Sequence, residues 1–225
     1  MIEFKHVSKQ YRNEIVALND VSFKIEKGEF VFIVGPSGAG KSTVAKLLLK
    51  EEEPSAGSLF FNDEDITTIR SRRIPLIRQK IGMVFQDFRL LEEKSVYDNI
   101  DYVLQIMGVS RKVKIRTIDR VLEAVNLQDK KKYLPRELSG GEQQRLSIAR
   151  AMVTKPRVLL ADEPTGNLDP ETSWEIVKAL QDINESGTTI LMITHAKEIV
   201  DRLKYRVLEF SKGELVRDEK GGSYS

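Results

Sequence analysis

The sequence predicts an α/β fold with a parallel-sheet core, an N-terminal antiparallel β subdomain and an inserted α-helical subdomain. The continuously apolar run 158–161 and the run 189–193, in which only Thr189 is polar, are typical of strands that are buried on both faces of a parallel sheet. Residues 2–7 alternate with the period of a strand, whereas apolar residues recur at helical spacing between residues 115 and 125. These three patterns place sheet at both ends of the chain and helices in the middle.

The chain has 225 residues, and we expect one domain in which 1–86 and 156–225 form the core with its β subdomain, and 87–155 the helical subdomain. The formal net charge of +2 gives no indication of nucleic-acid binding. The sequence has no cysteine, which excludes disulfides and thiolate metal sites and favours a reducing compartment. No apolar run reaches the roughly 18 to 20 residues of a membrane span, so work at a membrane would need a partner.

Residues 16–25 continue the strand pattern of residues 2–7, and Lys27-Gly28 is a turn into the apolar run 30–34. We expect an antiparallel sheet in this opening region. Tyr11 lies among polar residues, where a planar ring is free to stack on adenine. A half-buried tyrosine that contacts no ligand is the alternative.

A glycine-rich turn joins the predicted strand 30–34 to a predicted helix. Such a turn curls the backbone around a phosphate chain and points several N–H groups, with the helix N-terminus, into one concavity. Lys41 can reach the β- and γ-phosphates, and the Ser42 hydroxyl can bind the Mg²⁺ that accompanies a nucleoside triphosphate. The sequence therefore predicts a phosphate-binding P-loop that consists of Gly35, Pro36, Ser37, Gly38, Ala39, Gly40, Lys41, Ser42 and Thr43.

A basic stretch follows the predicted short strand 58–61. Such a run of cations is usually a solvated face, and binding of anionic lipid or of a partner is the alternative. Its members are Arg70, Arg72, Arg73, Arg78 and Lys80. The apolar run 81–85 then predicts a strand that ends at Gln86.

A second anion-binding device opens the last predicted helix of the helical segment. Ser139 supplies a hydroxyl, Gly140 and Gly141 allow close backbone approach, and the helix adds the positive end of its dipole. Because the P-loop already encloses the phosphates from one side, this second cradle is best used by a second copy of the chain. We therefore expect a head-to-tail homodimer around two ATP molecules.

Polar residues end the predicted parallel strands, and ligands of such sheets lie beyond the carboxyl ends. Asp162 is suited to hold Mg²⁺ directly or through water, and Glu163 to accept a proton from an attacking water. A helix cap or surface turn is the alternative for this pair. His195 follows the run 189–193, and Asp169 is the expected N-cap of a helix. The chain should end with a short hairpin over 206–215 and then disorder.

These motifs, in this order, resemble those of an ATP-binding-cassette (ABC) ATPase, which has a P-loop NTPase fold. The resemblance spans essentially the whole chain and implies hydrolysis of ATP with Mg²⁺. It implies that Tyr11 stacks on adenine and that Gln86 senses the γ-phosphate and Mg²⁺. It also implies that Asp169 lies across the dimer seam and that His195 positions the γ-phosphate and the water.

A finer resemblance is to the bacterial cell-division ATPases of the FtsE family, and it rests on the segments 84–91, 95–100, 164–176 and 197–200. It implies an FtsX-like integral membrane partner, through which extracellular peptidoglycan hydrolases are activated during division, and other division proteins as further partners. It also implies a peripheral place on the cytoplasmic face of the plasma membrane. Ala196 departs from the family, which often has asparagine there.

The residues after Gln86 leave two points open. Phe88, Leu90 and Leu91 either carry the movement of Gln86 to a membrane partner or simply pack in the core. The partner itself decides between the division function and the alternative, an ATPase subunit of an ABC exporter or of a lipoprotein-extraction transporter. A nucleic-acid-linked ATPase is disfavoured by the net charge and by the single cassette.

Overall fold

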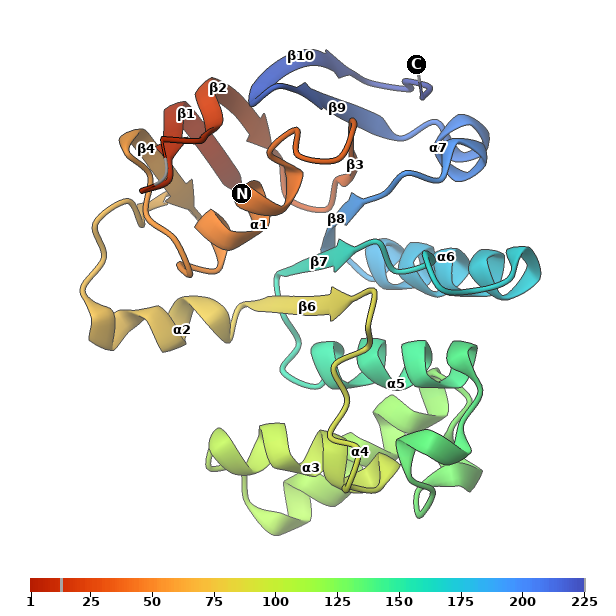
Figure 1. The fold of residues 1–225 in the computed structure, drawn as a ribbon. Coiled ribbons are helices and arrows are strands. Elements are labelled where there is room, and N and C mark those ends of the chain that lie inside the picture. Colours follow the sequence, from red (N-terminus) through yellow and green to blue (C-terminus); the bar gives the residue numbers. More distant parts are fainter. Residues whose placement is uncertain (13, 225) are drawn as a thin grey trace.

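The computed structural model describes residues 1–12 and 14–224, which form two β-sheets and a group of helices below them (Figure 1). The first sheet is antiparallel and has the strand order β2-β1-β4-β5. Its strands are β1 (Ile2–Gln10), β2 (Val16–Ile25), β4 (Ala56–Phe61) and β5 (Glu64–Asp65). Phe4 and Phe23 stack across β1 and β2 with their ring centroids 4.5 Å apart. The expected N-terminal antiparallel sheet is present.

The second sheet has the strand order β10-β9-β3-β8-β7-β6, in which only the pair of β9 and β10 is antiparallel. Its strands are β3 (Phe30–Val34), β6 (Ile81–Phe85), β7 (Val158–Asp162), β8 (Thr189–Ile193), β9 (Arg206–Ser211) and β10 (Glu214–Glu219). Alternate residues of β3 pack into two different clusters, Val31 and Ile33 into one, and Phe32 and Val34 into the other. Both faces of this strand are therefore buried, which explains its continuously apolar sequence.

Seven α-helices connect the strands within the described part of the chain. They are α1 (Lys41–Leu48), α2 (Ile74–Arg78), α3 (Val96–Ile106), α4 (Arg111–Ala124), α5 (Gly140–Met152), α6 (Pro170–Glu185) and α7 (Lys197–Leu203). Short 3₁₀ turns precede or follow three of them, at η1 (Ser71–Arg73), η2 (Gln128–Lys130) and η3 (Pro135–Glu137). None of the helices in residues 1–12 and 14–224 has the length and apolar character that crossing a membrane requires.

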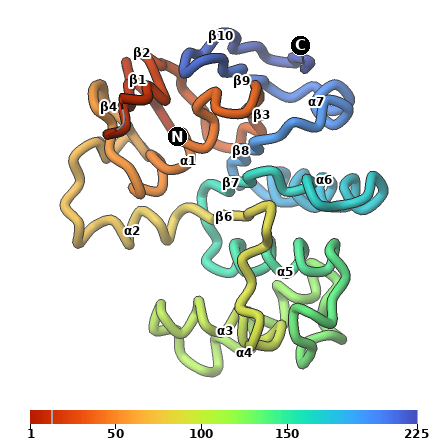
Figure 2. The backbone as a smooth tube through the Cα atoms, in the orientation of Figure 1, coloured from red at the N-terminus to blue at the C-terminus, as the bar shows by residue number. Residues whose placement is uncertain are grey.

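Helices α3, α4 and α5 enclose an apolar cluster of their own, which includes Ile100, Ile118, Leu122 and Leu146. The backbone trace shows them as a lobe beside β6 and away from the antiparallel sheet (Figure 2). All three helices fall within residues 87–155, and the boundaries at 86 and 156 stay a prediction. The α/β fold with its three parts is confirmed.

Two local features differ from the expectation. Strand β10 continues to Glu219, so the expected disorder after residue 215 is wrong there. The extension is held because Arg206 Nε donates to Asp218 at 2.7 Å and Arg217 Nε donates to Glu209 at 2.8 Å. Helix α2 was not predicted, since Pro75 in its first turn and the surrounding cations gave no helical pattern.

Candidate functional site

The glycine-rich turn lies between β3 and α1, at the carboxyl edge of the parallel sheet. Gly35 has a φ of 134°, and a Cβ there would lie 2.0 Å from the carbonyl oxygen of Phe210. Gly40 has a φ of 105°, and its Cβ would lie 2.4 Å from the carbonyl oxygen of Ala17. Both positions exclude any side chain, so the loop can take this curled path only with glycine.

Lys41 is held inside this curl. The residue is 6% exposed, and its Nζ donates to the carbonyl oxygens of Gly35 at 2.7 Å and Pro36 at 2.9 Å. Burial lowers the pKa of the Lys41 ammonium, against the raising effect of the charges of Glu163 and Asp162. An anionic phosphate chain beside Nζ would stabilise the charged form. Ser42, the next residue, is exposed and lines the adjoining cavities.

The polar residues that follow β6, β7 and β8 lie together around two adjoining cavities. One cavity has a volume of about 350 Å³ and is lined by Ser42, Phe85, Gln86, Asp87, Arg89, Asp162, Glu163 and Asn167. The other has a volume of about 200 Å³ and is lined by Ile15, Ala17, Ser37, Gly38, Gly40, Lys41, Ser42, Thr43, Glu163 and His195. Ser42 and Glu163 line both, so the P-loop and the strand ends form one continuous site.

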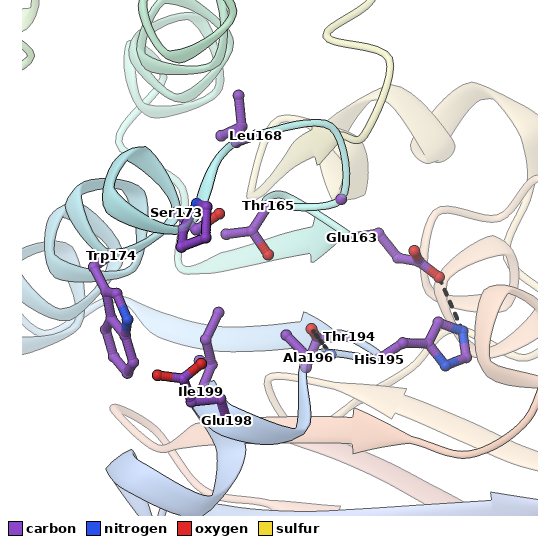
Figure 3. Close-up of a pocket in the computed structure, with 12 residues that line it drawn as sticks. Glu163, Thr165, Leu168, Ser173, Trp174, Thr194, His195, Ala196, Glu198 and Ile199 are labelled. Atoms are coloured by element: carbon purple, nitrogen blue, oxygen red, sulfur yellow. Dashed lines mark hydrogen bonds and ion pairs between the residues drawn. The ribbon is translucent and has the colours of Figure 1, made fainter.

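Glu163 and His195 face each other at this edge. His195 Nε2 lies 3.1 Å from Glu163 Oε1, and Figure 3 shows the two side chains directed toward each other from the ends of β7 and β8. Glu163 has a φ of 48°, and its backbone N–H donates to the carbonyl oxygen of Ile193 at 2.9 Å. This left-handed conformation turns the chain sharply just after the strand, which places the carboxylate beyond the sheet edge.

The donors in the larger cavity fit a magnesium ion that carries a nucleotide. Asp162 contributes a carboxylate, Ser42 a hydroxyl and Gln86 an amide oxygen, and Mg²⁺ prefers such oxygen ligands together with phosphate oxygens. Burial, and then the charge of Glu163, raise the pKa of the Asp162 carboxyl above its ordinary value. A cation beside the carboxylate would counter that shift. Residues 1–12 and 14–224 contain no cluster of three or more acidic, His or Cys side chains suited to a metal ion.

Gln86 is tied to the loop before α6. Its Nε2 donates to Asn167 Oδ1 at 3.2 Å, and Asn167 Nδ2 donates to the Gln86 carbonyl oxygen at 3.1 Å. A Cβ on Gly166 would lie 2.8 Å from Gln86 Nε2, so the glycine makes room for the amide. Asn167 was not among the predicted site residues. Its presence in the polar loop after the Asp162-Glu163 pair was the available signal.

Tyr11 has one ring face covered and its hydroxyl directed at the P-loop helix. Lys9 Nζ lies 5.0 Å from the ring centroid and is held by Glu52 at 2.7 Å and by the carbonyl oxygen of Glu53 at 2.9 Å. The Tyr11 hydroxyl lies 3.5 Å from Thr43 Oγ1. Lys9 thus fixes the ring by a cation–π contact from one side only. Tyr11 as a whole is half-buried.

Ser139 and Asp169 act as helix caps within this chain. Ser139 Oγ accepts from the Glu142 N–H at 3.3 Å, and Glu142 Oε2 accepts from the Ser139 N–H at 3.0 Å, which is a capping box. Asp169 accepts from the Thr172 N–H at 3.0 Å, and hydrogen bonds from Thr172 lower the pKa of the Asp169 carboxyl.

These caps lie apart from the P-loop of the same chain. Ser139, Gly140, Gly141 and Asp169 line neither of the two cavities described above. A Cβ on Gly141 would lie 2.5 Å from Thr172 Cγ2, so its close approach is to α6. A single copy of the chain therefore does not bring the Ser139-Gly140-Gly141 turn to its own P-loop.

The residues after Gln86 pack against the helical lobe. Leu90 is 8% exposed and lies in the cluster of α3, α4 and α5, with Phe88 packed beside it. Arg150 of α5 donates to the carbonyl oxygens of Phe88, at 2.8 Å, and of Arg89. Leu90 therefore packs in the core, as one of the two interpretations expects. The loop that follows Gln86 is joined to α5 by two hydrogen bonds.

Comparison with known sequences gives one consistent family. The ABC transporter family matches residues 18–166. The cell division ATP-binding protein FtsE of Bacillus subtilis is 50% identical over 100% of this chain and 98% of its own length. The FtsE protein of Mycobacterium tuberculosis is 53% identical over 100% of this chain and 98% of its own length. That of Escherichia coli K12 is 48% identical over 96% of this chain and 97% of its own length.

Solved structures agree with the sequence comparison. The dimeric ATP-binding cassette MJ0796 in a post-hydrolysis state bound to ADP and Pi is 32% identical, with a TM-score of 0.88 and complete coverage, 100% of both chains. CbiO1 from Clostridium perfringens, part of an ABC transporter complex, is 29% identical with a TM-score of 0.91, over 98% of this chain and 88% of its own. The chain is therefore an ATP-hydrolysing member of the ABC transporter family and belongs to its FtsE group.

Proposed function

We propose that the site at the carboxyl edge binds Mg-ATP with the base on Tyr11 and the phosphates in the loop 35–43. The observation that carries this assignment is the joined pair of cavities, in which Lys41, Ser42, Asp162 and Glu163 meet. Lys41 and the N-terminus of α1 supply positive charge for the phosphate chain. Ser42, Asp162 and Gln86 would hold Mg²⁺, which when bound neutralises charge on the β- and γ-phosphate oxygens.

Glu163 acts in this proposal as the general base for the water that attacks the γ-phosphorus. Its carboxylate borders both cavities and lies 3.1 Å from the His195 ring, which orients it. A positioned base typically contributes about 10² to 10⁴ in rate. His195 then contacts both the base and the γ-phosphate, while Gln86 reports the presence of the phosphate to the loop that Arg150 holds.

Two copies would close head to tail around two ATP molecules. The Ser139-Gly140-Gly141 turn of one copy faces the γ-phosphate held by the P-loop of the other, and Asp169 lies at the seam. Ser139 is exposed at the N-terminus of α5, where further N–H groups can bind an anion. The relative MJ0796 forms a dimer, which supports this arrangement. ATP would favour the closed pair, and hydrolysis would release it.

Replacing Tyr11 by alanine is expected to raise the KM for ATP about 5- to 100-fold and to leave kcat nearly unchanged. Stacking of a base on an aromatic ring contributes about 1 to 3 kcal/mol, and it acts on bound ATP before and during reaction alike. Tyr11→Phe keeps the ring and should keep the KM. Steady-state ATPase kinetics check both variants, and a large fall of kcat with unchanged KM in Tyr11→Ala would contradict adenine stacking.

We further propose that this ATPase drives an FtsX-like integral membrane protein in bacterial division, through which extracellular peptidoglycan hydrolases are activated. The chain would then lie on the cytoplasmic face of the plasma membrane, held there by its partner. The identity of about half of all residues with FtsE proteins supports this function. An ABC exporter or a lipoprotein-extraction transporter is the alternative, and the captured partner distinguishes them.

A groove between the sheet and the helical lobe is the surface that suits this partner. It has a volume of about 640 Å³ and is lined by Pro75, Arg78, Gln79, Ile81, Gly82, Met83, Phe85, Val103, Ile106, Met107, Arg150, Ala151 and Thr154. Ile106 is 70% exposed at its edge and Met107 beside it 37%, so apolar surface adjoins the groove. Arg150 lines the groove and also holds the loop after Gln86, so an occupant would contact the residue that couples to the nucleotide site.

Capture from detergent-solubilised membranes tests the partner. We expect the chain, with ATP and Mg²⁺, to retain an integral membrane protein with a large outer domain and no transport cavity. Ile106→Asp should abolish its capture and leave ATP binding intact, because a charge would enter the apolar groove. Tyr102→Asp, also on an exposed site of α3 but not among the groove residues, is the matched control. Capture of a transporter subunit instead would favour the alternative, and capture of no membrane protein would contradict both.

A further inference from the structure

We propose that cations around this groove bind an anionic lipid surface directly. We call them the basic rim, and they are Arg70, Arg72, Arg111, Lys112 and Arg116. The inference rests on the proposed function for the orientation of the groove toward a membrane. It adds a second contact, with lipid headgroups, to the contact with the membrane partner.

The basic rim flanks the groove on two sides. Arg70 and Arg72 lie at η1, directly before α2, whose Pro75 lines the groove. Met107 lines the other side of the groove, and a short connection leads from it to Arg111, the first residue of α4. Helix α2 and the connection between α3 and α4 lie on the same side of the molecule (Figure 1). The two segments that carry the cations therefore border the same groove, although about forty residues separate them in the sequence.

The charges of the basic rim are directed to no partner within the described residues, 1–12 and 14–224. All five side chains are exposed, and none of them takes part in an ion pair or side-chain hydrogen bond there. Neighbouring cations differ, since Arg73 pairs with Glu64 at 2.6 Å and Lys114 with Asp101 at 2.7 Å. The rim cations therefore keep their charge uncompensated by any carboxylate within this part of the chain.

Apolar side chains lie among the rim cations. Val113 is 52% exposed and Ile115 is 42% exposed, within the same turns of α4 as Lys112 and Arg116. Leu76 on α2 is 53% exposed. Exposed apolar groups mixed with Lys and Arg are typical of surfaces that lie in the headgroup region of a membrane. An anionic bilayer offers negative headgroups and an apolar interior to both sides of the groove at once, so it is the occupant that fits best.

Binding to vesicles tests the proposal without the membrane partner. The probe is the full chain with vesicles of phosphatidylcholine, with or without phosphatidylglycerol, measured by co-flotation at low and physiological salt. We expect binding only to the anionic vesicles, weakened by salt. The triple variant Arg72→Gln, Lys112→Gln, Arg116→Gln should bind at least tenfold more weakly, because each cation contributes about fivefold near an anionic surface.

The control removes equal charge from a different pocket, which none of the rim residues lines. Lys27, Lys155 and Arg157 are exposed cations around a pocket at the amino ends of β3 and β7. The triple variant Lys27→Gln, Lys155→Gln, Arg157→Gln should bind anionic vesicles as the wild type does. Equal losses in both triple variants, or binding of the wild type to phosphatidylcholine alone, would overturn the proposal.

Capture of the partner separates this inference from the proposed function. The rim variant should still hydrolyse ATP at the wild-type rate and should still retain the partner in detergent, where no bilayer is present. Loss of partner capture without loss of vesicle binding would mean that the rim docks an acidic protein segment, which overturns the lipid proposal. Failure of Ile106→Asp to reduce capture would contradict the proposed docking groove and leave the vesicle result valid.

Discussion

Replacing Lys41 by methionine is expected to weaken ATP binding about 10- to 100-fold and to reduce hydrolysis below detection at ordinary ATP concentrations. Lys41 is 6% exposed, and its ammonium is the cation held within the P-loop curl. A hydrogen bond to a charged group contributes about 1.5 to 3 kcal/mol, and every 1.4 kcal/mol is a factor of ten. Methionine keeps the apolar length of the side chain, so the loss reports the charge. Calorimetric titration with an ATP analogue measures it.

Lys46→Met is the matched control for Lys41. Lys46 lies on the same helix, α1, and is exposed in its last turn. Its removal should leave the affinity for ATP within about twofold, since an exposed charge contributes little. Thermal unfolding of both variants checks that the fold persists. ATP binding by Lys41→Met at wild-type affinity would show that the phosphates lie elsewhere.

The second large effect is expected for Glu163→Gln, which should lower kcat by about 10² to 10⁴ and keep ATP binding near the wild-type value. Glutamine has the shape of glutamate and can still hydrogen-bond to His195 Nε2, which lies 3.1 Å from Glu163 Oε1, but it cannot accept the proton of the attacking water. ATP that is bound and not hydrolysed should accumulate. Single-turnover kinetics of the chain with its membrane partner separate binding from hydrolysis.

Glu198→Gln is the control for Glu163. Glu198 lines the cavity on the far side of His195, and in Figure 3 its carboxylate lies away from the His195 ring. This substitution also removes one negative charge, and it should leave kcat unchanged. If Glu163→Gln hydrolysed ATP at the wild-type rate with the partner present, another group would have to be the base.

The core of the fold and the nucleotide site could be predicted because each depends on a short, continuous stretch of residues with a recognisable pattern. Strand β3 is apolar at every position and β8 at every position after Thr189, because both faces of these strands are buried. In the loop 35–43, Gly35 and Gly40 stand at positions where a Cβ would meet the backbone of another strand. Polar residues that end parallel strands necessarily share one edge of the sheet.

What could not be predicted depends on contacts between distant segments. Lys9 lies over Tyr11 because Glu52, beyond α1, holds its ammonium. Asn167 reaches Gln86 across the ends of two strands, and Arg150 reaches the loop after Gln86 from α5. Contacts between residues so far apart in the sequence leave no periodic pattern in it. The length of β10 was missed for the same reason, since ion pairs to β9 extend a strand whose own sequence is polar.

We expect two copies of the chain to close around ATP, with the Ser139 turn of one copy on the P-loop of the other. The most direct test is the mass of Glu163→Gln, measured by light scattering during gel filtration with Mg-ATP and with Mg-ADP. We predict a dimer with ATP and a monomer with ADP, and a monomer that still binds ATP when Ser139→Arg is added. An ATP-bound monomer of Glu163→Gln, or a dimer that persists with Ser139→Arg, would contradict the claim.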